Sequence, residues 1–274
     1  MNTLKSIVKY FFNKFLYLIL IVGLPSILAG FSMTGKGVFD LMIHFPQFQF
    51  ESFVDVYMVV LGRDARWLYL QPLAFIGLAL GMSLLYATID SHMRMGDFNI
   101  RNVVRKLDYN FLPCAKFVFS LAIAGHLLLL LLTSLIYLYY RISQNVTLAW
   151  VLTIVTIFLV GLIFMAIITW LLMWLPTMLH TGLRDARAFV MSSKQIAPVF
   201  MKTLFTLLIP VIPYILFMIL NSLFNWVVAI VFDVLFFAFF DMWATVAMNT
   251  IYYDLNNIER ADLNSMIWSK NIRS

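Results

Sequence analysis

The most informative pattern in this sequence is a series of long apolar stretches separated by short polar connections. Six stretches carry few or no charged residues, and at about 1.5 Å per helical residue each is long enough to cross a hydrocarbon core of about 30 Å. They are residues 15–33, 67–89, 112–140, 148–179, 200–220 and 226–252. The pattern predicts an all-α fold, a polytopic membrane helical bundle of about six transmembrane helices.

Composition supports a membrane class and argues against a soluble domain. Of the 274 residues, 63% are hydrophobic and 12% are charged, whereas soluble domains average about 45–50% and about 25%. The single cysteine, Cys114, allows no internal disulfide framework and no multi-thiolate metal site. Nothing in the sequence calls for nucleic-acid binding, and we expect no nucleic-acid partner.

Short amphipathic stretches precede spans one, three and five. Leu4, Ile7 and Phe11 recur at helical spacing in the first, Val103 and Leu107 recur in the second, and a weaker pattern surrounds Val190. We treat residues 1–274 as one integral membrane domain. It would contain three copies of an interfacial helix plus a helical hairpin, over 1–90, 98–180 and 181–255. The alternative is that basic flanks alone produce the likeness.

The distribution of Lys and Arg predicts the orientation. Fifteen of the 19 lie in the N-terminus, the second and fourth connections and the C-terminal tail, and four lie on the other side. Basic residues collect on the cytoplasmic side of membrane proteins. Both termini should therefore be cytoplasmic in a cell membrane, with anionic lipid headgroups as partners at that face.

Motifs for common enzyme chemistry are absent from the sequence. We find no phosphate-binding loop, no H-E-x-x-H and no G-x-S-x-G. The four histidines, His44, His92, His126 and His180, are too scattered to offer a ligand pair. We therefore expect no metal and no cofactor. Convergent polar groups at a membrane face would be needed for an enzyme, and the candidates are Arg184, Asp185, Asp254 and Arg260.

Three intramembrane polar residues form the candidate site: Asp233 and Asp241 in the sixth span and His126 in the third. A carboxylate in a span costs at least about 2.5 kcal/mol, so it should be paired, protonated or facing water. The two aspartates lie eight residues apart and can address one interior face at two depths. We expect at least one to contact polar atoms of span three or five, either to lock the bundle or to couple protons or cations.

Gly77 and Gly81 form a small-xxx-small pair in the second span. Such a pair lets another helix approach closely. Packing within the chain is the favoured interpretation, and a dimer interface is the alternative.

Two segments resemble a known group of bacterial membrane proteins. They are residues 180–195, HTGLRDARAFVMSSKQ, and residues 250–255, TIYYDL, with Arg260 and Asp262 after them. The chain resembles the YciC-like family and the membrane domain attached to some glycerophosphodiester phosphodiesterases. It is similar, more weakly, to YesL-like proteins around residues 13–25. In the phosphodiesterases a separate soluble domain carries catalysis, so the resemblance implies a bacterial membrane module that is not an enzyme.

These observations lead to three functional hypotheses. The first is a non-enzymatic accessory or organising role in the membrane, with another membrane protein complex as a partner. The second is a small transporter or channel that uses Asp233 and Asp241. The third, a lipid-modifying enzyme, is the least favoured.

Overall fold

The computed structural model describes residues 3–62, 69–96, 100–143, 145–183, 185–221 and 226–262, and every regular element in these ranges is helical. The elements follow in the order α1 (Thr3–Ser32), α2 (Lys36–His44), the short 3₁₀ helix η1 (Phe45–Gln47), α3 (Phe53–Leu61), α4 (Gln71–Met95), α5 (Ile100–Ile142), α6 (Val146–Leu171), α7 (Trp174–Thr181), α8 (Asp185–Ile196), η3 (Ala197–Val199), α9 (Phe200–Asn221) and α10 (Trp226–Leu255). The predicted all-α bundle is confirmed.

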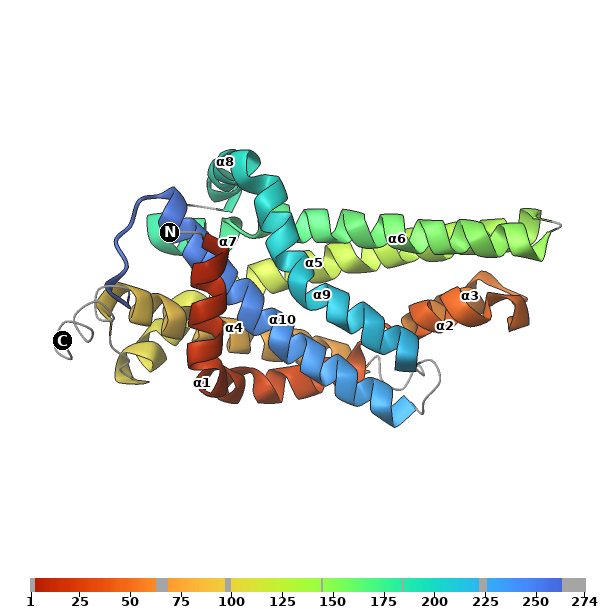
Figure 1. Cartoon of the computed structure of the whole chain (residues 1–274), viewed down its shortest axis with the longest axis horizontal. Helices are drawn as coiled ribbons and strands as arrows, with labels where there is room; N and C mark the ends of the chain where they lie inside the picture. The colour runs from red at the N-terminus through yellow and green to blue at the C-terminus, as the bar shows by residue number, and fades with distance from the viewer. Residues whose placement is uncertain are drawn as a thin grey trace.

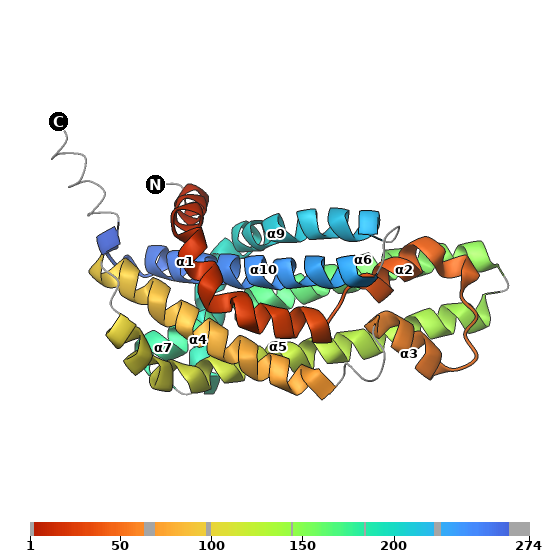
Figure 2. The ribbon, with the colours of Figure 1, turned by 90° about the horizontal axis from the view of Figure 1, so that it is seen from below.

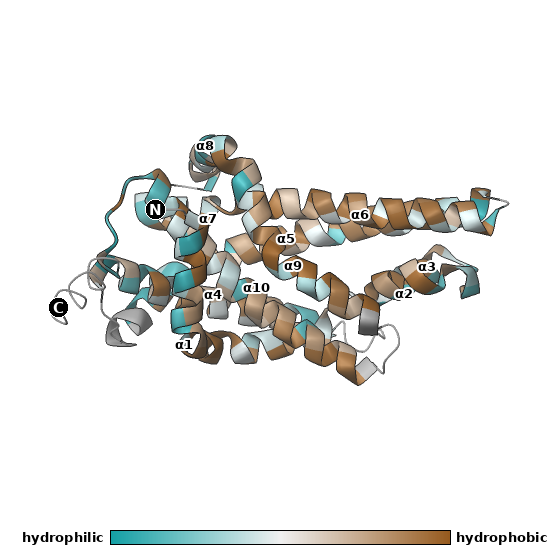
Figure 3. Cartoon of the chain, in the orientation of Figure 1, coloured by the Kyte–Doolittle hydropathy of each residue, from teal (hydrophilic) through white to brown (hydrophobic). Residues whose placement is uncertain are grey.

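Within the described residues, six helical segments are long and apolar enough to cross a membrane. They are Thr3–Ser32, Gln71–Met95, Arg105–Ile142, Val146–Thr181, Asp185–Ile219 and Val227–Leu255. The start of α1 and the end of α10 lie at one end of the elongated bundle, and the α5–α6 connection lies at the other (Figure 1). We call these the near end and the far end. Hydrophilic residues gather at both ends, and apolar residues fill the length between them (Figure 3).

The observed helices extend beyond several of the predicted span boundaries. The amphipathic stretches before spans one and three are continuous with α1 and α5, whereas α8 is separated from α9 by η3. The stretch 148–179 divides into α6 and α7, because Pro176 in the first turn of α7 has no N–H to donate to the preceding turn. The three-copy repeat stays a prediction.

Helix α1 packs along both α4 and α10 (Figure 2). The helices approach each other closely at glycine residues, which have no side chain. A Cβ atom at Gly30 of α1 would lie 2.4 Å from Val234 Cγ2 and 2.7 Å from the Val234 backbone nitrogen of α10. A Cβ at Gly81 of α4 would lie 2.9 Å from Pro25 Cγ of α1.

Helices α2 and α3 cover the α5–α6 hairpin at the far end. Leu41, Phe45 and Val56 are buried against that hairpin in a second apolar cluster. The Ser52 side chain accepts from the Asp55 amide, and the Ser52 amide donates to Asp55 Oδ2 at 2.8 Å, which closes a capping box. The Ser52 backbone hydrogen bond is the main cause that lowers the pKa of Asp55. Helices α2 and α3 are thus a packed pair.

Candidate functional site

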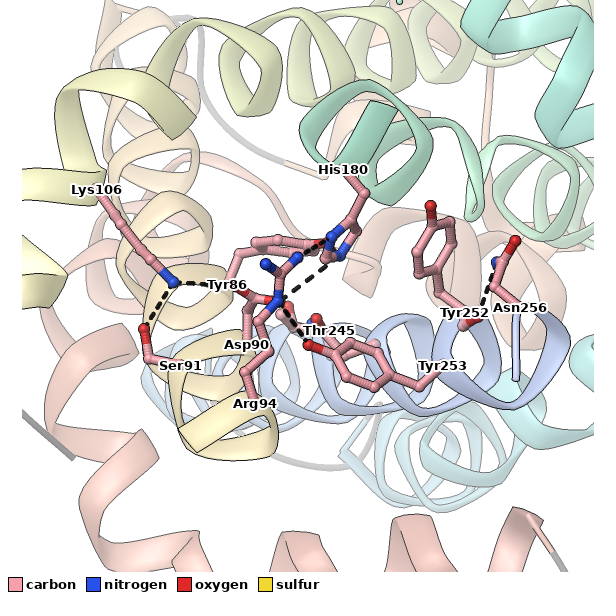
Figure 4. Close-up of polar contacts among 11 residues, drawn as sticks. Tyr86, Asp90, Ser91, Arg94, Lys106, His180, Thr245, Tyr252, Tyr253 and Asn256 are labelled. Atoms are coloured by element: carbon pink, nitrogen blue, oxygen red, sulfur yellow. Dashed lines mark hydrogen bonds and ion pairs between the residues drawn. The ribbon is translucent and has the colours of Figure 1, made fainter. Parts of the chain in front are cut away.

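The densest group of polar side chains surrounds Asp90 at the near end of the bundle. Its carboxylate is 7% exposed and accepts from Tyr253 Oη at 2.8 Å, Arg94 Nε at 3.1 Å and Lys106 Nζ at 3.1 Å. Figure 4 shows these side chains converging from three helices, α4, α5 and α10. Together with Tyr86 and His180 of α7 they form the group that we call the Asp90 cluster.

His180 completes the cluster from above Asp90 in Figure 4. Its Nδ1 faces Arg94 Nη2, and its Nε2 lies 2.8 Å from Tyr86 Oη. A guanidinium can only donate, so Nδ1 is the acceptor and the ring proton resides on Nε2. His180 is therefore neutral here, and its ring stacks on Tyr252 at 4.6 Å between centroids.

The cluster forms because α4 continues past the apolar stretch that ends at Ile89. Asp90 and Arg94 occupy the last turns of this helix, one helical turn apart, and form an i,i+4 pair. The helix then ends at Gly96, which adopts φ 72° and donates its N–H to the His92 carbonyl. Sequence reasoning missed Asp90, although a single acid following an apolar run, with a cation four residues later, was the available signal.

Asp233 occupies a second polar site, nearer the far end of α10. Its side chain is fully buried and accepts from Tyr214 Oη of α9 at 2.8 Å. The Tyr214 ring stacks on Phe236 with centroids 4.0 Å apart. The expected contact between an aspartate and span five is present.

Asp241 has a different environment from Asp233. It is partly exposed, and no hydrogen bond or ion pair of its side chain occurs within the described part of the chain. Its backbone carbonyl accepts from Thr245 Oγ1 at 2.7 Å. The structure therefore holds Asp233 by a direct hydrogen bond and leaves Asp241 without a protein partner in those residues.

His126 and the glycine pair contribute to packing. His126 Nδ1 lies 2.8 Å from the Ala122 carbonyl, and Nε2 lies 3.3 Å from Gln71 Oε1, so its ring nitrogens face these oxygens rather than either aspartate. Gly77 and Gly81 lie against Leu28 and Pro25 of α1. Their observed role is contact between α1 and α4 within one chain.

Among the described residues, the charged residues suggested for an enzyme take part in separate contacts. Arg184 lies outside the described residues, and Asp254 is exposed. Asp185 pairs with Lys116 at 2.8 Å, at a largely exposed position. Arg260 is buried and bonds Asp262 at 2.9 Å and Ser6 of α1 at 2.9 Å. The cluster that does converge uses other residues.

Three donors fill the Asp90 carboxylate, and this occupancy limits its chemistry. Its oxygens accept from two charged groups and one hydroxyl, so the carboxylate is engaged in contacts between helices. Among the described residues there is no group of three or more His, Cys, Asp and Glu side chains arranged to hold a metal ion. The arrangement is suited to joining four helices and to presenting cations at the near end.

Residues 180–195 and 250–256 meet at this end. His180 stacks on Tyr252, and Gln195 Nε2 donates to Asn256 Oδ1 at 3.1 Å. No family model, no curated protein and no solved structure matches the chain.

Proposed function

We propose that this chain is a non-enzymatic multi-pass protein of a bacterial cell membrane, with both termini in the cytoplasm, which supports or organises other membrane components. The observation that carries the proposal is how the polar groups of its long helices are used. Asp90, His126 and Asp233 all bond neighbouring helices of the same chain.

The outer surface of the bundle fits this role. Large apolar side chains are exposed along the spans, for example Leu20 of α1, Ile123 of α5 and Leu159 of α6. Lipid tails or another membrane protein would cover them, since water would not. The Asp233 carboxylate is buried and accepts from Tyr214 of α9, which suits a structural acid better than a transport site.

The test is ion flux through purified protein in liposomes. We expect proton, sodium and potassium fluxes equal to those of protein-free vesicles, and we expect Asp233→Asn to change nothing in that assay. Flux above the protein-free level that Asp233→Asn or Asp241→Asn abolishes, in protein that still elutes as a single folded species, would instead establish a transporter.

Asp241 supports the transporter as the second candidate. It is a partly exposed acid near the middle of a spanning helix, without a partner in the described residues. Such residues often mark ion or proton pathways. In that case Asp241→Asn should abolish flux while Asp233→Asn leaves a substantial fraction of it.

A further inference from the structure

The side chains of the two cations in the Asp90 cluster are partly exposed, whereas the carboxylate between them is buried. The side chains of Arg94 and Lys106 are 48% and 32% exposed, against 7% for Asp90 and 8% for His180. A structural ion pair needs only to satisfy the buried acid. The exposed parts of Arg94 and Lys106 are more than neutralisation of the Asp90 carboxylate requires.

The charges in the cluster do not balance. One carboxylate faces two cations, and His180 is neutral because its Nδ1 accepts from Arg94. One net positive charge is therefore left beside a buried polar group. A singly charged anion at this position would complete the neutralisation.

Hydrogen-bond donors also remain. Lys106 uses one contact for Asp90 and one for Ser91 Oγ at 2.9 Å, which leaves one of the three ammonium hydrogens. Arg94 directs Nε to Asp90 and Tyr253 and Nη2 to His180. Within the described residues its Nη1 group has no partner, so the outer edge of the guanidinium is free to bind an anion.

The position of the cluster indicates the source of that anion. Arg94 lies in the last turn of a spanning helix, α4, and the cluster also includes residues at the ends of α7 and α10. In a bilayer these helix ends would lie at the depth of the lipid headgroups on one side. A phosphodiester there carries one negative charge and oxygens that suit guanidinium and ammonium donors.

We propose that Arg94 and Lys106 form a binding site for a phosphate group, supplied by the headgroup of an anionic phospholipid at the near end of the bundle. Asp90, Tyr253 and His180 act as positioning residues, because they fix the two cations without contacting the phosphate. The inference rests on the membrane placement proposed above and does not depend on the accessory role.

The test measures thermal unfolding of the detergent-purified protein with three additives at equal phosphate concentration: phosphatidylglycerol, phosphatidylcholine and inorganic phosphate. We expect phosphatidylglycerol to raise the unfolding temperature more than phosphatidylcholine does. Lys106→Gln should weaken the apparent affinity for phosphatidylglycerol about tenfold, as expected for loss of one charge-assisted hydrogen bond. Lys106→Arg should retain it.

Lys116→Gln is the matched control, since Lys116 also lies on α5 and is similarly exposed but pairs with Asp185 outside the cluster. It should keep the response of the unchanged protein. Equal protection by inorganic phosphate would support the phosphate site and assign it a soluble ligand. Equal responses to the two lipids, or equal loss in both glutamine variants, would overturn the proposal.

If Lys106→Gln does not fold, the lipid preference of the unchanged protein and of Lys106→Arg still decides the question. Failure of the proposed function is seen separately. Ion flux in liposomes would contradict the accessory role and leave the lipid preference unaffected. Failure of the protein to associate with membranes in the absence of detergent would contradict the membrane placement itself.

Discussion

At the scale of single residues, the stability of the structure depends on the hydrogen bonds and ion pairs that buried carboxylates form. Asp90 accepts from two cations and a hydroxyl, and Asp233 accepts from the hydroxyl of Tyr214. Removing one member of a buried ion pair strands the opposite charge, which costs more than the pair itself contributes. Replacing Asp90 with a neutral residue should therefore destabilise the protein.

Asp90→Asn should destabilise the protein by about 3 kcal/mol, at the low end for a broken buried pair because Arg94 and Lys106 are partly exposed. The measurement is reversible unfolding in detergent micelles. Asp185→Asn is the control, because Asp185 is 52% exposed and its pair with Lys116 should contribute less than about 1 kcal/mol. Similar losses in both variants would contradict the central role given to Asp90.

The hydrogen bond between Tyr214 and Asp233 can be measured by a double-mutant cycle with Tyr214→Phe and Asp233→Asn. We expect a coupling energy of about 0.6 kcal/mol and no more than about 1.7 kcal/mol, the range for hydrogen bonds between membrane helices. Pairing Tyr214→Phe with Asp241→Asn should give no coupling, since the Asp241 side chain has no hydrogen bond or ion pair in the described part of the chain. Coupling in that second cycle would show that the two aspartates act together.

At the scale of elements, the helices were largely predictable from sequence and the polar cluster was not. Apolar stretches as long as 148–179 are suited to the hydrocarbon core of a bilayer. Six helices of spanning length therefore follow from hydropathy alone. Asp90, Lys106, His180 and Tyr253 are separated along the chain and meet only through helix packing. Asp233 and Asp241 can be recognised in the sequence because they interrupt an apolar stretch, whereas Asp90 lies where such a stretch ends.

The contact between α1 and α10 gives the sharpest prediction at this scale. Gly30→Ala would place a Cβ 2.7 Å from the Val234 backbone nitrogen, which cannot move aside as a flexible side chain can. Forced overpacking should destabilise the protein by about 1–3 kcal/mol. Gly23→Ala in the same helix meets no atom within 4 Å and should be neutral or stabilising by up to about 1 kcal/mol. Unfolding in micelles compares the two, and equal effects would rule out a close α1–α10 approach at Gly30.

At the scale of the whole molecule, the two polar ends differ in kind. The near end holds the Asp90 cluster and the buried Arg260–Asp262 pair, which ties the segment after α10 to Ser6 of α1. The far end holds α2 and α3 packed on the α5–α6 hairpin, with Arg141 near Tyr137 and Glu51. Among the described residues, the ion pairs that join two helices, Asp90–Lys106 and Lys116–Asp185, lie on the side that is rich in basic residues, whereas Lys36–Asp40 at the far end lies within α2.

This asymmetry leads to a prediction of orientation that thiol labelling can test. Single cysteines would be introduced as Lys5→Cys, Glu51→Cys and Glu259→Cys in a Cys114→Ser background. All three positions are exposed, whereas Ser6 is buried against Arg260 and would label poorly whichever side it faced. Because 15 of 19 basic residues lie on the side of the termini, we expect an impermeant reagent to label only the Glu51 variant in intact cells. The Lys5 and Glu259 variants should react after permeabilisation, which serves as their control for reactivity. Labelling of either in intact cells would reverse the orientation, and it would place the phosphate site of Arg94 and Lys106 on the outer leaflet.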